Sequence, residues 1–167
     1  HKRAFEGDVG PNTGGMGTCS FANHSLPFLS DKDINDAQKT NERVARELCS
    51  TTGTKFKGFL YGGFMATKDG VKVIEYNARL GDPEAMNVLS LLKTDFFDIC
   101  SHIIGGSLKN IDIKFEPYAT VCKYAVPNGY PDNPEKGFVV SIENVNTDNF
   151  FFAAVREDEN KIIATGS

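Results

Sequence analysis

Hydrophobic positions between Ser30 and Gly53 recur every three or four residues, which is the period of an amphipathic α-helix. The polar run Ser30–Asp33 offers N-cap chemistry, and Thr51-Thr52-Gly53 ends the pattern. We therefore predict one helix here, with a single apolar face and a charged outer face. The apolar positions are Ile34, Ala37, Val44, Ala45 and Leu48.

Two β-prone runs follow, GFLYGGFMAT at residues 58–67 and VKVIEYN at residues 71–77. Lys68-Asp69-Gly70 separates them, and because Asp-Gly favours a tight turn, the pattern predicts an antiparallel hairpin. Helical periodicity then returns over residues 84–93 and 95–104, and Thr94 or Asp95 would cap the second of these helices.

The last third of the chain changes character, because short β-prone runs separated by turns such as PNGYPDNP replace the helical pattern. At the other end, the glycine-rich segment GDVGPNTGGMG at residues 7–17 predicts an irregular loop that continues to Leu29. The expected fold class is α+β. Residues 1–109 would contain antiparallel strands with packed helices, and residues 110–167 would begin a β-rich domain.

Composition and charge exclude several classes of protein. The 167 residues are 40% hydrophobic, which predicts a sizeable core, and the net charge of −4 argues against a nucleic-acid or acidic-membrane partner. No apolar run is long enough to span a bilayer. The four cysteines are widely spaced, so we expect buried, inert thiols in a reducing, cytoplasmic setting. Because the chain has neither an initiator Met nor signal-peptide character, we expect a piece of a longer polypeptide.

The main candidate chemistry lies at the end of the second predicted strand. Residues two apart in a strand share a face, so Glu75 and Asn77 would project together. A carboxylate and an amide carbonyl are oxygen ligands that Mg²⁺ accepts, with water and substrate phosphates completing its octahedron. The alternative is that Glu75 and Asn77 form a solvent-facing polar pair. Taken without their neighbours, the two residues favour this alternative. Arg79, Asp82 and Glu84, which follow closely, shift the balance toward a phosphate or substrate site.

The glycine-rich loop is the second candidate. It is not a Walker A motif, since no Lys-Ser or Lys-Thr follows the glycines, and it is not a dinucleotide-binding fingerprint, since no strand precedes it in a βαβ unit. It predicts either a plain turn or a backbone cradle for anionic oxygens. The candidate donors are Asn12, Thr13, Gly14 and Gly15, with positive charge from Lys2 and Arg3.

Four segments together resemble the phosphoribosylamine-glycine ligase family, also called glycinamide ribonucleotide synthetases: HKRAFEGDVGPNTGGMG, GFLYGGFM, VIEYNARLGDPE and NGYPDNP. The resemblance spans nearly the whole chain in the family's order. It implies the second half of an ATP-grasp domain and a reaction of purine biosynthesis. In that reaction the ATP γ-phosphate is transferred to glycine, and 5-phosphoribosylamine then attacks the glycyl phosphate, giving glycinamide ribonucleotide, ADP and phosphate.

The resemblance also implies roles by position. Glu75 and Asn77 match the family's ligands for Mg²⁺ (or Mn²⁺). Arg79 matches an arginine that stabilises the transferring phosphoryl group or its acceptor. Asp82 and Glu84 match the GDPE element, which we assign to orienting the amine-bearing substrates.

Two positions on the first predicted strand complete the comparison. Met65 falls where ATP-grasp enzymes place an apolar residue under the adenine of ATP, although ordinary core packing is the alternative that its chemistry favours. Gly63 departs from the pattern, because many ATP-grasp enzymes carry another acidic metal ligand there.

The family places an N-terminal domain and a mobile lid ahead of HKR. The resemblance therefore implies that residues 1–167 alone are inactive, or nearly so, and that they work with the remainder of the same polypeptide in a monomer or dimer. Two alternatives stay open. One is another ATP-grasp ligase or carboxylase with a different acceptor, and the other is a non-catalytic nucleotide-binding module.

Overall fold

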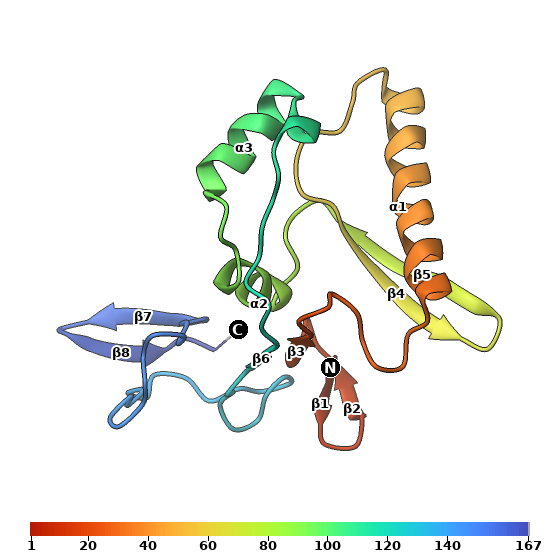
Figure 1. The fold of residues 1–167 in the computed structure, drawn as a ribbon. Helices are drawn as coiled ribbons and strands as arrows, with labels where there is room; N and C mark the ends of the chain where they lie inside the picture. The colour runs from red at the N-terminus through yellow and green to blue at the C-terminus, as the bar shows by residue number, and fades with distance from the viewer. Residues whose placement is uncertain (167) are drawn as a thin grey trace. The chain divides into compact units, whose positions relative to one another are not determined.

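A computed structural model describes residues 1–166 of the chain (Figure 1). Its elements are, in chain order, β1 (Arg3–Phe5), β2 (Val9–Asn12), β3 (Gly17–Ser20), α1 (Asp31–Thr52), β4 (Tyr61–Thr67), β5 (Gly70–Asn77), α2 (Glu84–Ser90), α3 (Phe96–Gly105), the 3₁₀ turn η1 (Leu108–Asn110), β6 (Thr120–Lys123), β7 (Val155–Asp158) and β8 (Lys161–Ala164). The chain forms two compact units. The central unit comprises residues 19–122, and the terminal unit comprises residues 1–18 with those from 123 onward. The mixture of helices and antiparallel strands confirms the α+β class, whereas the expected boundary between residues 109 and 110 stays a prediction.

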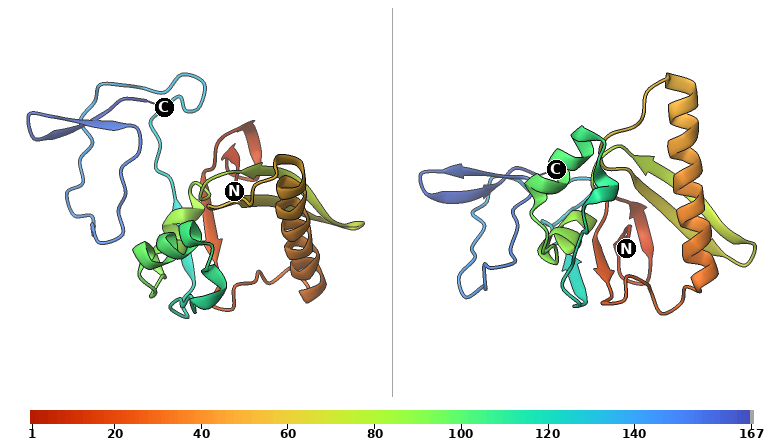
Figure 2. Two further views of the ribbon diagram at one scale, coloured as in Figure 1. Left: turned by 90° about the horizontal axis from the view of Figure 1, so that it is seen from above. Right: turned by 45° about the horizontal axis from the view of Figure 1, so that its top comes forward.

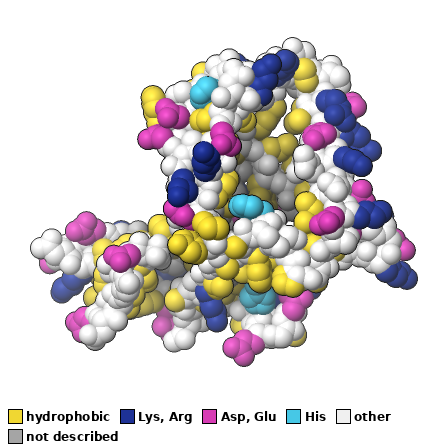
Figure 3. All heavy atoms as spheres, viewed as in Figure 1, with side chains coloured by type: hydrophobic (Ala, Val, Ile, Leu, Met, Phe, Trp, Pro, Cys, Tyr) yellow, Lys and Arg dark blue, Asp and Glu magenta, His cyan; other side chains and the backbone are white. Residues whose placement is uncertain are grey.

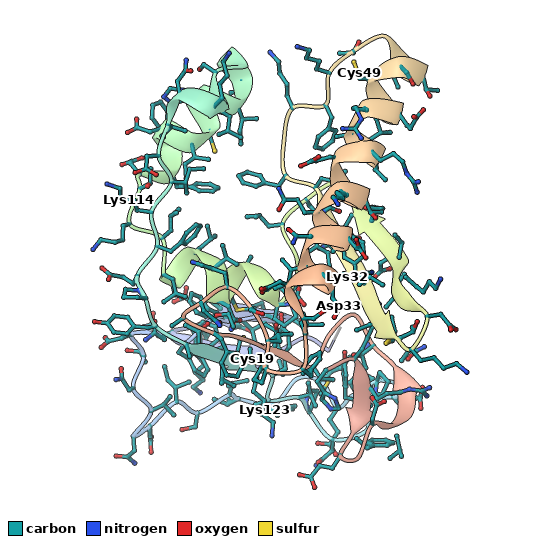
Figure 4. The ribbon with its side chains drawn as sticks, turned by 45° about the vertical axis from the view of Figure 1, so that its right-hand side comes forward. Cys19, Lys32, Asp33, Cys49, Lys114 and Lys123 are labelled. Carbon is teal, nitrogen blue, oxygen red and sulfur yellow. The ribbon has the colours of Figure 1, made fainter. Side chains whose placement is uncertain are left out.

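In the central unit, α1 begins and ends where the sequence predicts. The Ser30 side chain accepts a hydrogen bond from the Asp33 backbone N–H, and the Asp33 carboxylate accepts one from the Ser30 backbone N–H, which is a capping box. Gly53 ends the helix in the left-handed conformation. Figure 4 shows Lys32 and Asp33 in the first turn and Cys49 toward the opposite end.

β4 and β5 form the predicted antiparallel hairpin, with Tyr61 opposite Asn77 and Thr67 opposite Gly70. The register shifts between Gly63 and Phe64, so that Ile74 is the extra residue of a β-bulge. α1 lies along one face of this hairpin, as Figures 1 and 2 show from three directions.

The helix predicted over residues 84–93 is shorter in the structure, because α2 ends at Ser90. The residues that follow leave the helix to pair with a distant segment. Lys93 N–H donates to Lys114 O at 2.9 Å, and Glu116 N–H donates to Leu91 O at 2.7 Å. Backbone groups that bond to another segment cannot also continue a helix. α3 starts after Asp95, whose carboxylate accepts from the Phe97 backbone N–H, so Asp95 is the cap.

The strands β2 and β3 correct the prediction that residues 7–29 are irregular. In the terminal unit, β1 pairs with β2 in a short antiparallel hairpin, and β3 (Gly17–Ser20) begins in this unit and ends in the central one. The turn of the hairpin is closed by Gly7 and Asp8, whose φ angles are 73° and 59°. A Cβ at Gly10 would collide with the Phe5 ring, so this glycine allows close packing within the hairpin.

The β-prone runs of the last third form fewer strands than predicted. β7 and β8 pair as a hairpin, with Val155 opposite Ala164. Among the described residues, the run 137–145 contributes one bridge, Val139 to Ile163, and the run 111–115 contributes one bridge to Leu92. A run with high β-propensity forms a strand only where another segment pairs with it along its length.

The sizeable core predicted from composition is not found in the described residues, where the buried hydrophobic side chains are Met16, Leu91, Ile99 and Ala164. The expected burial of the cysteines is wrong for the same reason, because Cys19 is exposed and the other three are half-buried. The exposed area is 12056 Å², whereas two separate compact units of these sizes would expose about 9,800 Å². Figure 3 shows hydrophobic side chains at the surface and in the hollow between α1 and α3. Within residues 1–166, none of the helices has both the length and the apolar character needed to cross a membrane.

Candidate functional site

The main candidate site lies on the face of the β4–β5 hairpin opposite α1. Residues directly opposed in an antiparallel pair share a face. Glu75 lies opposite Gly63, and Asn77 lies opposite Tyr61. The two predicted ligand side chains are therefore on one face, as their spacing indicates, with Glu75 exposed and Asn77 half-buried.

The oxygen ligands on this face fit a hard divalent cation. In the described part of the chain, no group of three or more His, Cys, Asp or Glu residues is placed to hold a metal ion. Mg²⁺ commonly takes one or two protein ligands and completes its octahedron with phosphates and water, so a pair of oxygen-bearing side chains is of the kind that it accepts. A Cβ at Gly63 would lie 3.5 Å from Glu75 Cγ, which is an ordinary contact distance. A larger residue would therefore fit at position 63, although glycine leaves more space next to the carboxylate.

Arg79 orients the amide of this pair. Its guanidinium donates one hydrogen bond to Asn77 Oδ1 at 3.3 Å and another to Leu80 O at 2.8 Å. A guanidinium carries five N–H donors, so others remain for phosphate or carboxylate oxygens. The side chain is exposed. Arg79 and Asn77 are thus brought together as the sequence suggested.

The GDPE turn follows directly and is tightly packed at alternate positions. Gly81 and Pro83 are buried, Asp82 is exposed, and Glu84 is half-buried at the start of α2. A Cβ at Gly81 would lie 2.5 Å from Glu84 Oε2 and 2.9 Å from Tyr61 Cδ2. The turn therefore holds the Glu84 carboxylate close to the Tyr61 ring, and a larger residue at position 81 would separate them.

Tyr61 is a site residue that sequence reasoning missed. Burial raises the pKa of its hydroxyl to about 12, and the charge of Glu84, a hydrogen bond to Glu84 and the charge of Glu75 act in the same direction, against Arg79. The phenol therefore stays protonated and can donate to a carboxylate. The sequence contained a clue, because Tyr61 precedes Gly63 by two positions and so shares its face.

Met65 lies on the same face as Tyr61 and Gly63, since the extra residue of the bulge is on β5 and the alternation of β4 is unbroken. Its side chain is 54% exposed. Ordinary core packing, the alternative that the sequence favoured, is therefore not its role in the central unit. Met65 instead presents an apolar surface on the face that carries Glu75.

Behind the GDPE turn, α2 is fixed to β6 by buried polar groups. Asn87 is 3% exposed, and its Nδ2 donates to Thr120 Oγ1 at 2.8 Å. The Thr120 hydroxyl in turn lies 2.6 Å from Ser20 Oγ. On the same strand, burial and the charges of Asp82 and Glu84 raise the pKa of the Cys122 thiol. The negative charge of the GDPE turn therefore affects the pKa of a side chain on β6.

The predicted anion cradle belongs to the terminal unit. Thr13 donates its backbone N–H and its hydroxyl to Lys2 O, at 2.9 and 2.8 Å, so these two donors are engaged within the hairpin. Arg3 Nη1 donates to Gly10 O at 2.8 Å, and Asn12 lies opposite Arg3. Gly14 is exposed, with open space where a Cβ would be, and Gly15 is half-buried. The structure thus groups these six residues in one unit and the hairpin residues in the other.

The family model described as "Phosphoribosylglycinamide synthetase, ATP-grasp (A) domain" matches residues 1–85. Over 167 residues, the whole chain is 50% identical to a phosphoribosylamine-glycine ligase of Methanosarcina barkeri and 51% identical to one of Methanosarcina acetivorans. A crystal structure of phosphoribosylamine-glycine ligase from Thermotoga maritima matches with a TM-score of 0.72 at 30% identity, covering 99% of this chain and 40% of that one. The chain spans 39% and 38% of the two Methanosarcina proteins.

Proposed function

The chain belongs to the phosphoribosylglycinamide synthetase family, and from this premise we propose that it forms part of an ATP-dependent ligase that joins glycine to 5-phosphoribosylamine. The names of the similar proteins support this reaction. The single structural observation that carries the proposal is the register of β4 and β5, which sets Glu75 and Asn77 on one open face. Cytoplasmic location and assembly as a monomer or dimer remain predictions from the sequence.

In this proposal, Glu75 and Asn77 would hold Mg²⁺, or Mn²⁺ in its place. The ion, when bound, neutralises charge on the ATP phosphates. Met65 would offer its exposed side chain to the adenine. Arg79, already bonded to Asn77 Oδ1, would place its remaining N–H groups on the transferring phosphoryl group or on the carboxylate that accepts it.

The reaction requires two displacements. A glycine carboxylate oxygen attacks the γ-phosphorus of ATP, and ADP leaves. The amine nitrogen of 5-phosphoribosylamine then attacks the carbonyl carbon of glycyl phosphate, the C–O bond to phosphate breaks, and the nitrogen loses a proton. Asp82 and Glu84 are proposed to accept hydrogen bonds from the amine-bearing substrates and so to orient them for these steps.

The donors of the glycine-rich segment are proposed to bind substrate anions. Gly14 and Gly15 offer backbone N–H groups, and Asn12 offers its side-chain amide. Lys2 and Arg3 would add positive charge. Thr13 stabilises this segment, because its backbone N–H and its hydroxyl both donate hydrogen bonds to the Lys2 carbonyl.

The test replaces Glu75 by Gln in the whole protein, which removes charge and keeps the shape of the side chain. We expect loss of glycine-dependent phosphate release with an unchanged circular dichroism spectrum and melting temperature. Glu42→Gln, at an exposed position of α1, is the matched control and should leave turnover intact. Normal turnover in Glu75→Gln would show that the metal is held elsewhere.

The choice of acceptor is tested with the unmodified protein. Phosphate release from ATP should depend on glycine and 5-phosphoribosylamine, and bicarbonate should not replace glycine. A requirement for bicarbonate would instead favour a carboxylase. Binding of ATP without turnover under any of these conditions would favour a non-catalytic module. Residues 1–167 alone are predicted to release no phosphate with ATP and glycine.

A further inference from the structure

Two tyrosines lie on opposite faces of the β4–β5 hairpin. Tyr61 lies opposite Asn77, on the face of Glu75, whereas Tyr76 lies opposite Gly62 on the other face. The Tyr76 hydroxyl donates to Asn41 Oδ1 of α1 at 2.9 Å, which gives it a structural partner. Tyr61 instead lies near Glu84 at the start of α2, since a Cβ at Gly81 would approach both side chains, and the Glu84 carboxylate helps to raise the pKa of the Tyr61 hydroxyl.

The backbone of the GDPE turn packs against both the Tyr61 ring and Glu84. Gly81 is buried, and a Cβ at this position would approach both the Glu84 carboxylate and the Tyr61 ring to within 3 Å. Ala85 N–H donates to Gly81 O at 2.9 Å, which holds the turn against the start of α2. The proximity of the Tyr61 ring and the Glu84 carboxylate is therefore built into the packing around the buried Gly81.

We propose that Tyr61 is a positioning residue of the ligase, whose hydroxyl donates a hydrogen bond to the Glu84 carboxylate and holds it in place to accept a hydrogen bond from the attacking amine. The proposal rests on the ligase function proposed above. A carboxylate has two oxygens, so one can bind the phenol while the other receives the amine N–H. Fixing the acceptor reduces the orientational freedom that must be lost before the amine attacks.

The test is a kinetic double-mutant cycle of Tyr61→Phe and Glu84→Gln in the whole protein. Phenylalanine keeps the ring beside Gly81 and removes only the hydroxyl. We expect Tyr61→Phe to raise the KM for 5-phosphoribosylamine by roughly 10- to 100-fold, the effect of losing one hydrogen bond to a charged group. The KM for ATP should stay unchanged, because Tyr61 acts through Glu84, and Glu84 is proposed to contact only the amine-bearing substrates.

In the Glu84→Gln background, Tyr61→Phe should have a smaller effect, since the neutral amide oxygen accepts a weaker hydrogen bond from the phenol than the carboxylate does. Tyr76→Phe is the matched control on the opposite face and should lower stability without changing the KM for the amine. Gly81→Ala tests the same contact independently, because it forces Glu84 away from Tyr61 and should also raise the KM for the amine.

Several results would overturn the inference. They are an unchanged KM for the amine in Tyr61→Phe, full additivity with Glu84→Gln, or equal effects on all three substrates. These results leave the proposed function intact as long as the unmodified protein forms product and Glu75→Gln does not. An unmodified protein without glycine-dependent turnover would overturn the proposed function itself.

Discussion

The Tyr76 hydroxyl donates a hydrogen bond of 2.9 Å to Asn41 Oδ1, which joins the middle of α1 to the back of the β4–β5 hairpin. Gly62 permits this contact, because a Cβ there would lie 2.9 Å from both Asn41 Oδ1 and Tyr76 Cε1. The Phe64 ring packs edge-on against Tyr76 at 6.2 Å. One face of the hairpin is thus used for packing against α1, and Glu75 lies on the other face.

Tyr76→Phe should lower the free energy of unfolding by about 1 kcal/mol, because the half-buried Asn41 amide loses its partner while the ring stays in place. Chemical denaturation of the whole protein measures the change. Steady-state kinetics should be unaffected. A loss of turnover without a loss of stability would show that the back of the hairpin also contributes to the site.

The capping box of α1 gives a second stability prediction. Ser30→Ala removes the acceptor of the Asp33 backbone N–H and should cost about 1 kcal/mol. Ser50→Ala is the matched control, because Ser50 lies exposed in the last turns and bonds only to Glu47. Thermal unfolding should distinguish the two variants. Equal melting temperatures would mean that the start of α1 is not part of the cooperative unit.

Local chemistry explains what the sequence predicted well. α1 has a capping box at one end and a left-handed glycine at the other, and Asp-Gly marks the hairpin turn, so each boundary depends on residues close in sequence. The common face of Glu75 and Asn77 follows from the two-residue period of a strand. These features require no knowledge of distant contacts.

The missed features depend on residues far apart in the chain. α2 ends early because residues 91–93 bond to residues 114–116, and no pattern within residues 84–93 announces this pairing. The β1–β2 hairpin was missed because its glycines predict loops, although here they serve a turn and a close approach to Phe5. Tyr61 was missed because its contact with Glu84 depends on how the GDPE turn folds back.

Cys122 can report the charge of the GDPE turn. Burial and the carboxylates of Asp82 and Glu84 raise the pKa of its thiol, because they disfavour the thiolate. Asp82→Asn should therefore lower that pKa and accelerate alkylation of Cys122 near pH 8 by roughly two- to fivefold. Mass spectrometry would measure the rate, with exposed Cys19 as the internal control. An unchanged rate at Cys122 would show that Asp82 does not act on the thiol.

Gly63 provides the sharpest test of the metal site, because it lies directly opposite Glu75. Its Cβ position lies 3.5 Å from Glu75 Cγ, which is ordinary van der Waals contact, so a side chain fits there. Gly63→Asp would place a second carboxylate on the proposed metal face. We expect it to tighten Mn²⁺ binding by roughly tenfold, since another negative oxygen ligand strengthens attraction to a divalent cation.

The same variant should be less stable without metal, because two adjacent carboxylates repel each other and one is driven to take up a proton. Gly63→Asn separates charge from size, since it adds nearly the same volume without a charge. Isothermal titration calorimetry with Mn²⁺ on the nucleotide-free whole protein measures both variants. If Gly63→Asn tightens binding as much as Gly63→Asp, the added negative charge is not the cause of the tighter binding. If neither does, the cation does not bind on this face, and the assignment of Glu75 and Asn77 as its ligands is wrong.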